Sequence, residues 1–243
     1  MIDVVETIGF PLACKINKKI DKKLFIENFS LNINERKILS ANVERITLEY
    51  LLNKNNINIL PFVDEERDYS EIAFVRVEIT NKTKYKTITS IIQNIPYPLI
   101  IFIQCEKTLM VNISPKRINK SDSSKLVVEE SHFTDWIDIL NPSEIEIAFI
   151  ESLAAKNHPF TDLYAFYNSY LDRIIAFNAS KHSGTLRSNE DTKVILEEIT
   201  VHEVKITKLK NKIKKETNFN DKVNLNIELK KVNDRLNTLK GKL

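Results

Sequence analysis

The C-terminal stretch from Lys205 to Leu243 carries a regular apolar repeat that one helix cannot bury by itself. Six apolar side chains recur there at intervals of 4, 3, 4, 3 and 4 residues: Leu225, Leu229, Val232, Leu236, Leu239 and Leu243. This spacing is the heptad pattern of a coiled coil. A helix with one narrow apolar stripe and charged outer faces needs a partner helix, from its own chain or from another. The sequence therefore predicts association before it predicts any chemistry.

A second apolar seam precedes this repeat and consists of Ile199, His202, Ile206, Leu209 and Ile213. The second seam does not run into the repeat, because the twelve residues from Ile213 to Leu225 correspond to roughly 1,200° of helical rotation, a third of a turn out of register. The asparagine-rich segment 216–221 lies between the two and favours a turn. We therefore expect an antiparallel helical hairpin rather than one continuous helix.

Charge is distributed unevenly along the chain. From Lys205 to Leu243 there are 12 basic and 4 acidic residues, a local net charge of +8. Because the whole chain carries only +3, residues 1–204 must carry −5. An acidic body with a basic appendage indicates an anionic partner, nucleic acid above all. The alternative is a lysine-rich coiled-coil surface that only contacts solvent.

The middle of the chain predicts a small mixed sheet with helices packed on one face. Three runs rich in β-branched and aromatic residues read as strands, and they are Ile72–Ile79, Leu99–Ile103 and Leu109–Ile113. Helical spacing over residues 84–94 separates the first two runs. Leu99–Ile103 is continuously apolar, which is typical of a central strand buried on both faces.

Less regular segments flank the predicted sheet. Residues 9–60 have mostly helical spacing, although Val43–Tyr50 also fits a strand. Residues 115–124 are basic and contain serines, so we expect a loop, with a short strand after it at 126–130.

The predicted organisation is an α+β body over residues 1–180, a linker at 181–188 and a basic helical hairpin at 189–243. Two helices end the body, at 144–155 with an Asn141-Pro142 start, and from Thr161 to about residue 178. The hairpin is expected to begin with Ser188, Glu190 and Asp191 as a capped first turn.

No catalytic, cofactor or metal-binding signature stands out. Cys14 and Cys105 are far apart and lie in apolar surroundings, so two reduced buried thiols are expected. The four histidines are not spaced as zinc ligands, and three glycines cannot supply a phosphate-binding loop. A metal-dependent nuclease using Glu71, Glu78 and Lys82 is the one enzymatic alternative. Glu71 and Glu78, however, are an odd number of residues apart and face opposite sides of a regular strand.

The candidate site residues are therefore binding residues. The partner-binding set is the pair of seams, Ile206, Leu209, Ile213, Leu225, Leu229, Val232, Leu236 and Leu239. The nucleic-acid-binding set is basic, Lys116, Arg117, Lys120, Lys208, Lys212 and Lys215. No reader motif accompanies these cations, so only non-specific contact with nucleic acid is predicted.

Several short motifs recur in the order of a known family. They are Phe10-Pro11 followed by Asn17-Lys18-Lys19-Ile20, then Ile95-Pro96-Tyr97, Thr134-Asp135-Trp136, and the string Phe219-Asn220-Asp221-Lys222-Val223-Asn224-Leu225-Asn226-Ile227-Glu228-Leu229-Lys230. On these residues the chain resembles the bacterial domain-of-unknown-function family 4391 over nearly its whole length. The resemblance implies genes located beside a DEAD/DEAH-type helicase and a DNA methyltransferase in restriction-like anti-phage loci. It implies no catalytic residues.

Together these observations favour a non-catalytic accessory subunit of a DNA-modifying, anti-phage complex, docked through its hairpin on a helicase or methyltransferase. One alternative is a nuclease or other effector with an unrecognised active site. Another is a structural protein that self-associates as a homodimer through the hairpin. We expect a cytoplasmic protein, because Met1–Leu12 has no basic signal-peptide region and the longest apolar run, Pro96–Ile103, is too short to span a bilayer.

Overall fold

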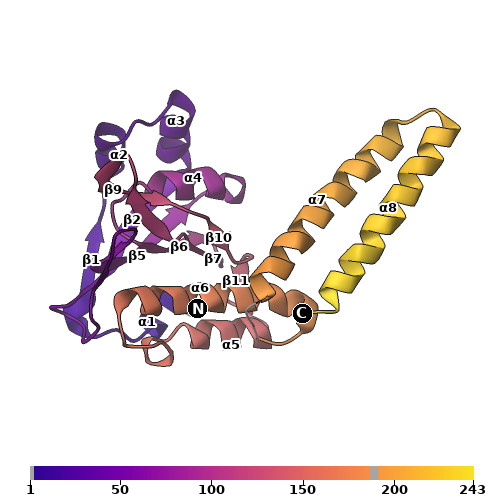
Figure 1. Cartoon of the computed structure of the whole chain (residues 1–243). Helices are drawn as coiled ribbons and strands as arrows, with labels where there is room; N and C mark the ends of the chain where they lie inside the picture. Colours follow the sequence, from indigo (N-terminus) through magenta and orange to yellow (C-terminus); the bar gives the residue numbers. More distant parts are fainter. Residues whose placement is uncertain (1–2, 187–190) are drawn as a thin grey trace. The chain divides into compact units, whose positions relative to one another are not determined.

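The structure is a computed structural model, and it describes residues 3–186 and 191–243, without the side chains of residues 123 and 124 (Figure 1). The predicted helix start at Ser188 and Glu190 lies outside these residues. Two compact units are present, Met1–Ile174 and Ile175–Leu243. Helix α6, Leu163–Ser183, crosses this division and extends into the predicted linker.

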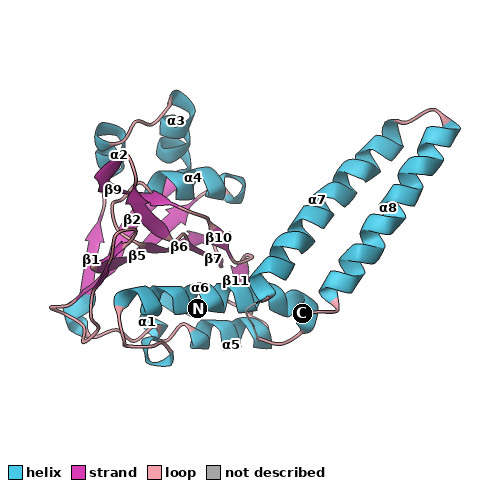
Figure 2. Cartoon of the chain, viewed as in Figure 1, coloured by secondary structure: helices cyan, strands magenta, loops and turns pink. Residues whose placement is uncertain are grey.

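The first unit is built on a mixed sheet with the strand order β1-β2-β5-β6-β7-β10 in the described residues, and the short β11 also pairs with β7 (Figure 2). The strands are β1 Lys15–Lys19, β2 Val43–Asn53, β5 Glu71–Ile79, β6 Leu99–Cys105, β7 Thr108–Ile113, β10 His132–Phe133 and β11 Ile137–Asp138. Strands β5 and β6 are parallel, because helix α4, Tyr85–Ile92, connects them, whereas the other pairs are antiparallel. The α+β class and the mixed sheet are confirmed.

Helices cover both faces of this sheet (Figure 1). On one face, Ala73, Val75 and Val77 of β5 share a core with helices α2 (Lys22–Asn28), α3 (Ile33–Asn42) and α4. On the other face, the ring of Phe74 contacts Tyr170 of α6, with 5.6 Å between ring centroids. Successive strand residues point to opposite faces, so both faces of β5 are buried. The prediction of helices on one face only is therefore wrong.

The region from residue 9 to residue 60 is less helical than predicted. Its ambiguous segment is strand β2, and the lysine-rich segment before it forms the edge strand β1. All five residues of β1 are exposed, so this segment does not bury a helix face. Pairing with β2 decides the conformation of β1, which is a tertiary contact that local spacing does not encode.

Several predicted boundaries also shift. The predicted loop at 115–124 is wrong, because it belongs to a hairpin of β8, Lys116–Asn119, and β9, Asp122–Val128. Helix α5, Glu144–Ser152, begins at the capping box of Ser143 rather than at Asn141-Pro142. The remaining short elements of this unit are α1 Val4–Thr7, β3 Phe62–Val63 and β4 Asp68–Tyr69, with single 3₁₀ turns at Leu12–Cys14, Lys82–Lys84 and Ala155–Asn157. Cys14 and Cys105 are free and buried, as predicted.

The second unit contains the helices α7, Thr192–Lys215, and α8, Phe219–Lys240. They contact each other as an antiparallel pair, which confirms the predicted hairpin (Figure 1). None of the helices in the described ranges combines the length and the apolarity that crossing a membrane requires.

Candidate interaction surfaces

The apolar seams of α7 and α8 pack against each other. Their core consists of Ile199, Ile206, Leu209, Val232, Leu236 and Leu239, with Ile195, Leu225, Leu229 and Leu243 partly buried around it. Seven of the eight predicted partner-binding side chains belong to this cluster, and Ile213 lies half-buried near the turn. The seam is thus covered by the chain's own two helices, which leaves the outer faces of the hairpin for any other molecule.

Polar contacts fix the turn and the register of the hairpin. Glu216 Oε1 accepts hydrogen bonds from the backbone N–H groups of Thr217 and Asn218, at 2.9 Å each. Asn218 Oδ1 then caps α8 by accepting from Asn220 N at 2.9 Å. Across the pair, Lys205 Nζ lies 2.8 Å from Glu228 Oε1, which lowers the pKa of the Glu228 carboxyl by hydrogen bonding and charge.

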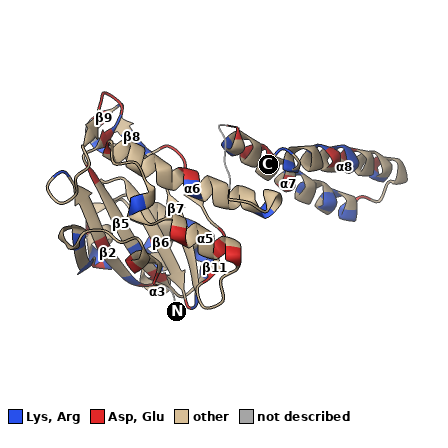
Figure 3. Ribbon diagram, turned by 90° about the horizontal axis from the view of Figure 1, so that it is seen from below, with Lys and Arg blue, Asp and Glu red and all other residues tan. Residues whose placement is uncertain are grey.

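The outer face of α7 is apolar in the middle of the helix and basic towards its end. Val201 and Val204 are 65% and 50% exposed, and helical intervals of three or four residues connect them to Lys208, Lys212 and Lys215. All three predicted lysines are exposed, and no carboxylate in the described part of the chain forms an ion pair with them. Figure 3 shows basic residues along both helices. This row could contact phosphates or an acidic protein surface.

The outer face of α8 carries an apolar stripe that the sequence interpretation missed. Phe219, Val223 and Ile227 are 78%, 41% and 50% exposed and recur every four residues. At 100° per residue they lie roughly opposite the seam. The i, i+4, i+8 spacing of these residues is present in the sequence. The heptad repeat beside it is stronger, so the sequence interpretation considered only that one seam on this helix. We define these three residues as the α8 stripe.

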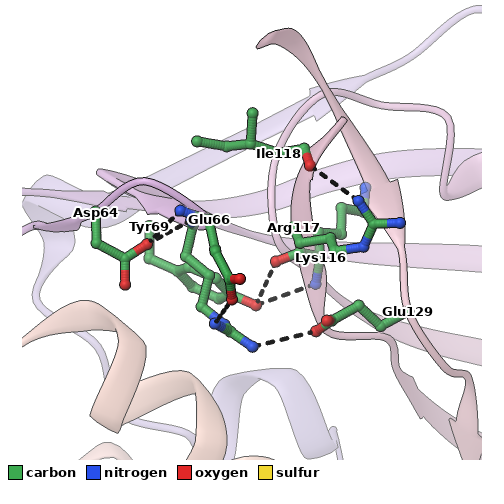
Figure 4. Close-up of polar contacts among 8 residues, drawn as sticks. Asp64, Glu66, Tyr69, Lys116, Arg117, Ile118 and Glu129 are labelled. Carbon is green, nitrogen blue, oxygen red and sulfur yellow. Dashed lines mark hydrogen bonds and ion pairs between the residues drawn. The ribbon is translucent and has the colours of Figure 1, made fainter. Parts of the chain in front are cut away.

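Lys116 is not available to nucleic acid, contrary to the prediction. Its side chain is 1% exposed, and its ammonium donates to the carbonyl oxygens of Gln93 and Ile95, at 2.8 and 2.7 Å. Its backbone N–H donates to the hydroxyl of Tyr69, which donates in turn to the Lys116 carbonyl (Figure 4). Burial lowers the pKa of the ammonium to about 7. Lys116 therefore ties the β8–β9 hairpin to the C-terminal end of α4.

The two other predicted cations of this hairpin are not brought together with Lys116. Arg117 is half-buried and donates to the Ile118 carbonyl at 3.2 Å (Figure 4). Lys120 is exposed at the β8–β9 turn. Nearby, Arg67 lies 3.7 Å from Glu129, so a carboxylate also faces this region. The β8–β9 hairpin of the body therefore presents isolated cations, whereas the α7–α8 hairpin presents a row of three lysines.

The carboxylates considered for a nuclease are dispersed. Glu71 accepts a hydrogen bond from Asn53 at the start of β5, and Glu78 lies near the other end of that strand. Between them, Arg76 contacts both Asp3 and Glu49 at 2.7 Å. Within residues 3–186 and 191–243, no three His, Cys, Asp or Glu side chains are grouped so that they could hold a metal ion.

Comparison with known proteins gives one family. The family described as Domain of unknown function (DUF4391) matches residues 8–236. No curated protein and no solved structure shows significant similarity to the chain.

Proposed function

Since the chain belongs to the DUF4391 family, whose function is unknown, we propose a function from its own geometry. The protein is a cytoplasmic, non-catalytic accessory subunit of a DNA-modifying defence complex, and its α7–α8 hairpin docks on a partner protein. The observation that carries this proposal is the α8 stripe. The helicase or DNA methyltransferase implied by the family resemblance is the partner we would test.

The stripe favours docking on a partner, because its side chains do not contribute to the packing of α7 against α8. The seam already buries six side chains, so Phe219, Val223 and Ile227 add nothing to helix pairing. Three large apolar side chains on successive turns form the kind of surface that a helix presents to a groove. The lysine row Lys208–Lys215 belongs to the same half of the hairpin, next to the turn. The two rows lie on the outer faces of different helices, so a partner would combine an apolar contact with an acidic surface by wrapping around the turn.

The test is capture of a co-expressed helicase or methyltransferase by the full chain. Val223→Asp with Ile227→Asp places two charges in the stripe and leaves the seam intact. We expect the captured amount to fall at least about tenfold, since each charge would be buried against the partner. The matched control is Asn224→Asp with Asn237→Asp, two exposed positions that receive the same charge. Equal capture by both double variants would refute docking through the stripe.

The same variants distinguish self-association from docking on a partner protein. If the wild-type chain elutes as a dimer, captures neither protein, and becomes a monomer in the stripe variant, the surface is a homodimer interface and the accessory-subunit proposal fails.

Contact with DNA is the smaller part of the proposal. Replacing Lys208, Lys212 and Lys215 by glutamine removes three exposed cations and leaves the seam unchanged. If all three contact phosphates, the slope of log affinity against log salt for duplex DNA should decrease by about 2 to 3. An unchanged slope in filter-binding assays would indicate that the row is only solvated.

A further inference from the structure

A groove lies in the first unit between helix α4 and strand β9, with a volume of about 840 Å³. Its lining comes from α2, α4, β9 and β10 and the segments next to them, and includes Lys86, Thr89, Gln93, Lys125, Leu126 and Val128. Four consecutive residues of β9 belong to it. A strand that lines a groove with consecutive residues presents its backbone edge as well as its side chains.

The hydrogen bonds of β8 show which backbone groups of β9 point away from β8. In an antiparallel pair, residues alternate between pairs that exchange hydrogen bonds and pairs whose N–H and C=O groups point outward. Lys116 N–H donates to Tyr69 and Ile118 N–H donates to Glu66, both away from β9. Their partners across the hairpin, Val128 and Leu126, therefore also direct N–H and C=O away from β8, and both residues line the groove.

These outward groups form an open strand edge. Strand β9 pairs only with β8, and no other segment of the described chain donates to or accepts from the backbone of Leu126 or Val128. An edge of this kind is a template for one more strand. Two outward residues at positions i and i+2 supply two donors and two acceptors in register with an extended chain.

The opposite wall of the groove has buried polar atoms without partners. Thr89 on α4 and Gln93 directly after it are 2% and 6% exposed, yet within the described residues Thr89 Oγ1 and Gln93 Oε1 have no hydrogen-bond partner. The orientation of the Gln93 amide is fixed, because its Nε2 donates to Asn112 Oδ1 at 2.9 Å while Asn112 Nδ2 donates to the His132 carbonyl. An unsatisfied buried acceptor is costly, so a ligand that brings donors would be favoured here.

The charge of the lining selects among extended ligands. Lys86 and Lys125 are exposed at the groove, and the lining contains no carboxylate. Lys125 forms an ion pair with Asp122 at 2.7 Å, but both side chains are accessible and such pairs exchange readily. The remaining lining is apolar or neutral, with Phe29, Pro96 and Phe133 among it.

We propose that the α4–β9 groove binds an extended, acidic peptide segment of a partner protein, which adds to the free edge of β9 as a further strand. The backbone of the peptide pairs with Leu126 and Val128, its donors reach Thr89 and Gln93, and its carboxylates face Lys86 and Lys125. This site is independent of the α8 stripe, and either proposal can hold without the other.

The first test is selection from a phage-displayed library of random peptides of about ten residues on the immobilised full chain. We expect enrichment of acidic sequences rich in β-branched residues. A selected peptide, labelled with fluorescein, is then titrated against variants. Leu126→Pro removes an outward N–H that does not take part in pairing with β8, and should weaken binding at least about tenfold. Leu126→Val keeps the N–H and should bind as the wild type does.

Further variants keep the result decisive if Leu126→Pro perturbs the hairpin. Thr89→Val keeps the shape of the side chain, leaves no unsatisfied hydroxyl, and should weaken peptide binding about threefold to tenfold without lowering thermal stability. Lys86→Glu with Lys125→Glu should reverse the preference from acidic to basic peptides, whereas Lys120→Glu at the hairpin turn should not.

Two results would overturn the proposal. One is a library that yields no peptide sensitive to Leu126→Pro or Thr89→Val. The other is binding of oligodeoxythymidine that is lost with Lys86→Glu and Lys125→Glu but unaffected by Leu126→Pro. The second result would assign the groove to single-stranded nucleic acid.

Discussion

The sheet body and the α7–α8 hairpin bury their side chains in different ways. In the body, residues far apart in sequence share directional contacts, as where the Tyr167 hydroxyl accepts from Ser114 N and donates to the Leu99 carbonyl at 3.0 Å. In the hairpin, the core is apolar, and the turn is held by groups one to three residues apart. Buried hydrogen bonds between distant residues specify one arrangement, whereas an apolar seam specifies mainly a spacing. The body is therefore the part of the molecule with the more narrowly defined interior.

The largest expected effect falls on the body alone. Phe74→Ala removes a fully buried ring that contacts Phe10, Phe102 and Tyr170, and should lower the free energy of unfolding by about 3 to 5 kcal/mol. Hydrogen exchange on the full chain should show faster exchange of the β5 and β6 amides, while the amides of α7 and α8 change little.

The contrast between the body and the hairpin would be lost if Phe74→Ala accelerated the exchange of the α7 and α8 amides as much as that of the β5 and β6 amides. Leu236→Ala is the reciprocal variant, because it leaves a cavity in the seam. It should accelerate exchange in α7 and α8 and spare the sheet.

A second effect, of intermediate size, is the pH dependence of stability that Lys116 is expected to cause. Its pKa is about 7 in the folded protein against 10.5 for an ordinary lysine, so between these values the unfolded chain binds more protons. The free energy of unfolding should therefore rise with pH over this window, by about 2 kcal/mol between pH 7 and pH 9. Urea denaturation at a series of pH values measures this contribution as the difference between the wild type and Lys116→Met.

Lys120→Met is the control for this experiment, because Lys120 is an exposed lysine of the same hairpin and should leave the pH dependence unchanged. A Lys116→Met variant with the same slope as the wild type would show that Lys116 does not become neutral in this range.

The same contrast explains which parts of the structure could be predicted from the sequence. The hairpin follows from the spacing of Leu225 to Leu239 and from the phase break before it, because both are local. The strands β5 and β6 were also recognisable, β5 from its β-branched and aromatic residues and β6 from a continuously apolar run that is buried on both faces. The helices on both sides of the sheet were not predicted, because only the three-dimensional arrangement shows that Ala73 and Phe74 face different helical layers.

The binding surfaces were harder to predict for a related reason. In the sequence, Lys116 cannot be distinguished from a surface lysine. Only its contacts with Gln93 and Ile95 show that its role is structural. The α4–β9 groove depends on which edge of the β8–β9 hairpin remains unpaired. The sequence predicted a short strand at 126–130 but a loop at 115–124, so the pairing of β8 with β9 was not predicted. The predicted α8 seam was real, but a self-paired seam and a docking seam have the same heptad pattern.

The smallest expected effect tests whether the stability of the α7–α8 hairpin depends on contacts within the hairpin alone. Asn218→Ala removes the side chain that caps α8 and should lower the stability of the hairpin by about 1 kcal/mol. Asn218→Asp keeps a capping oxygen and adds a charge that the helix dipole favours, so it should retain most of that stability. Hydrogen exchange of the first turn of α8 separates the two variants. An equal loss in both would argue that Asn218 acts through its place in the turn instead of through the cap. Faster exchange in β5 after Asn218→Ala would show that the turn is coupled to the body.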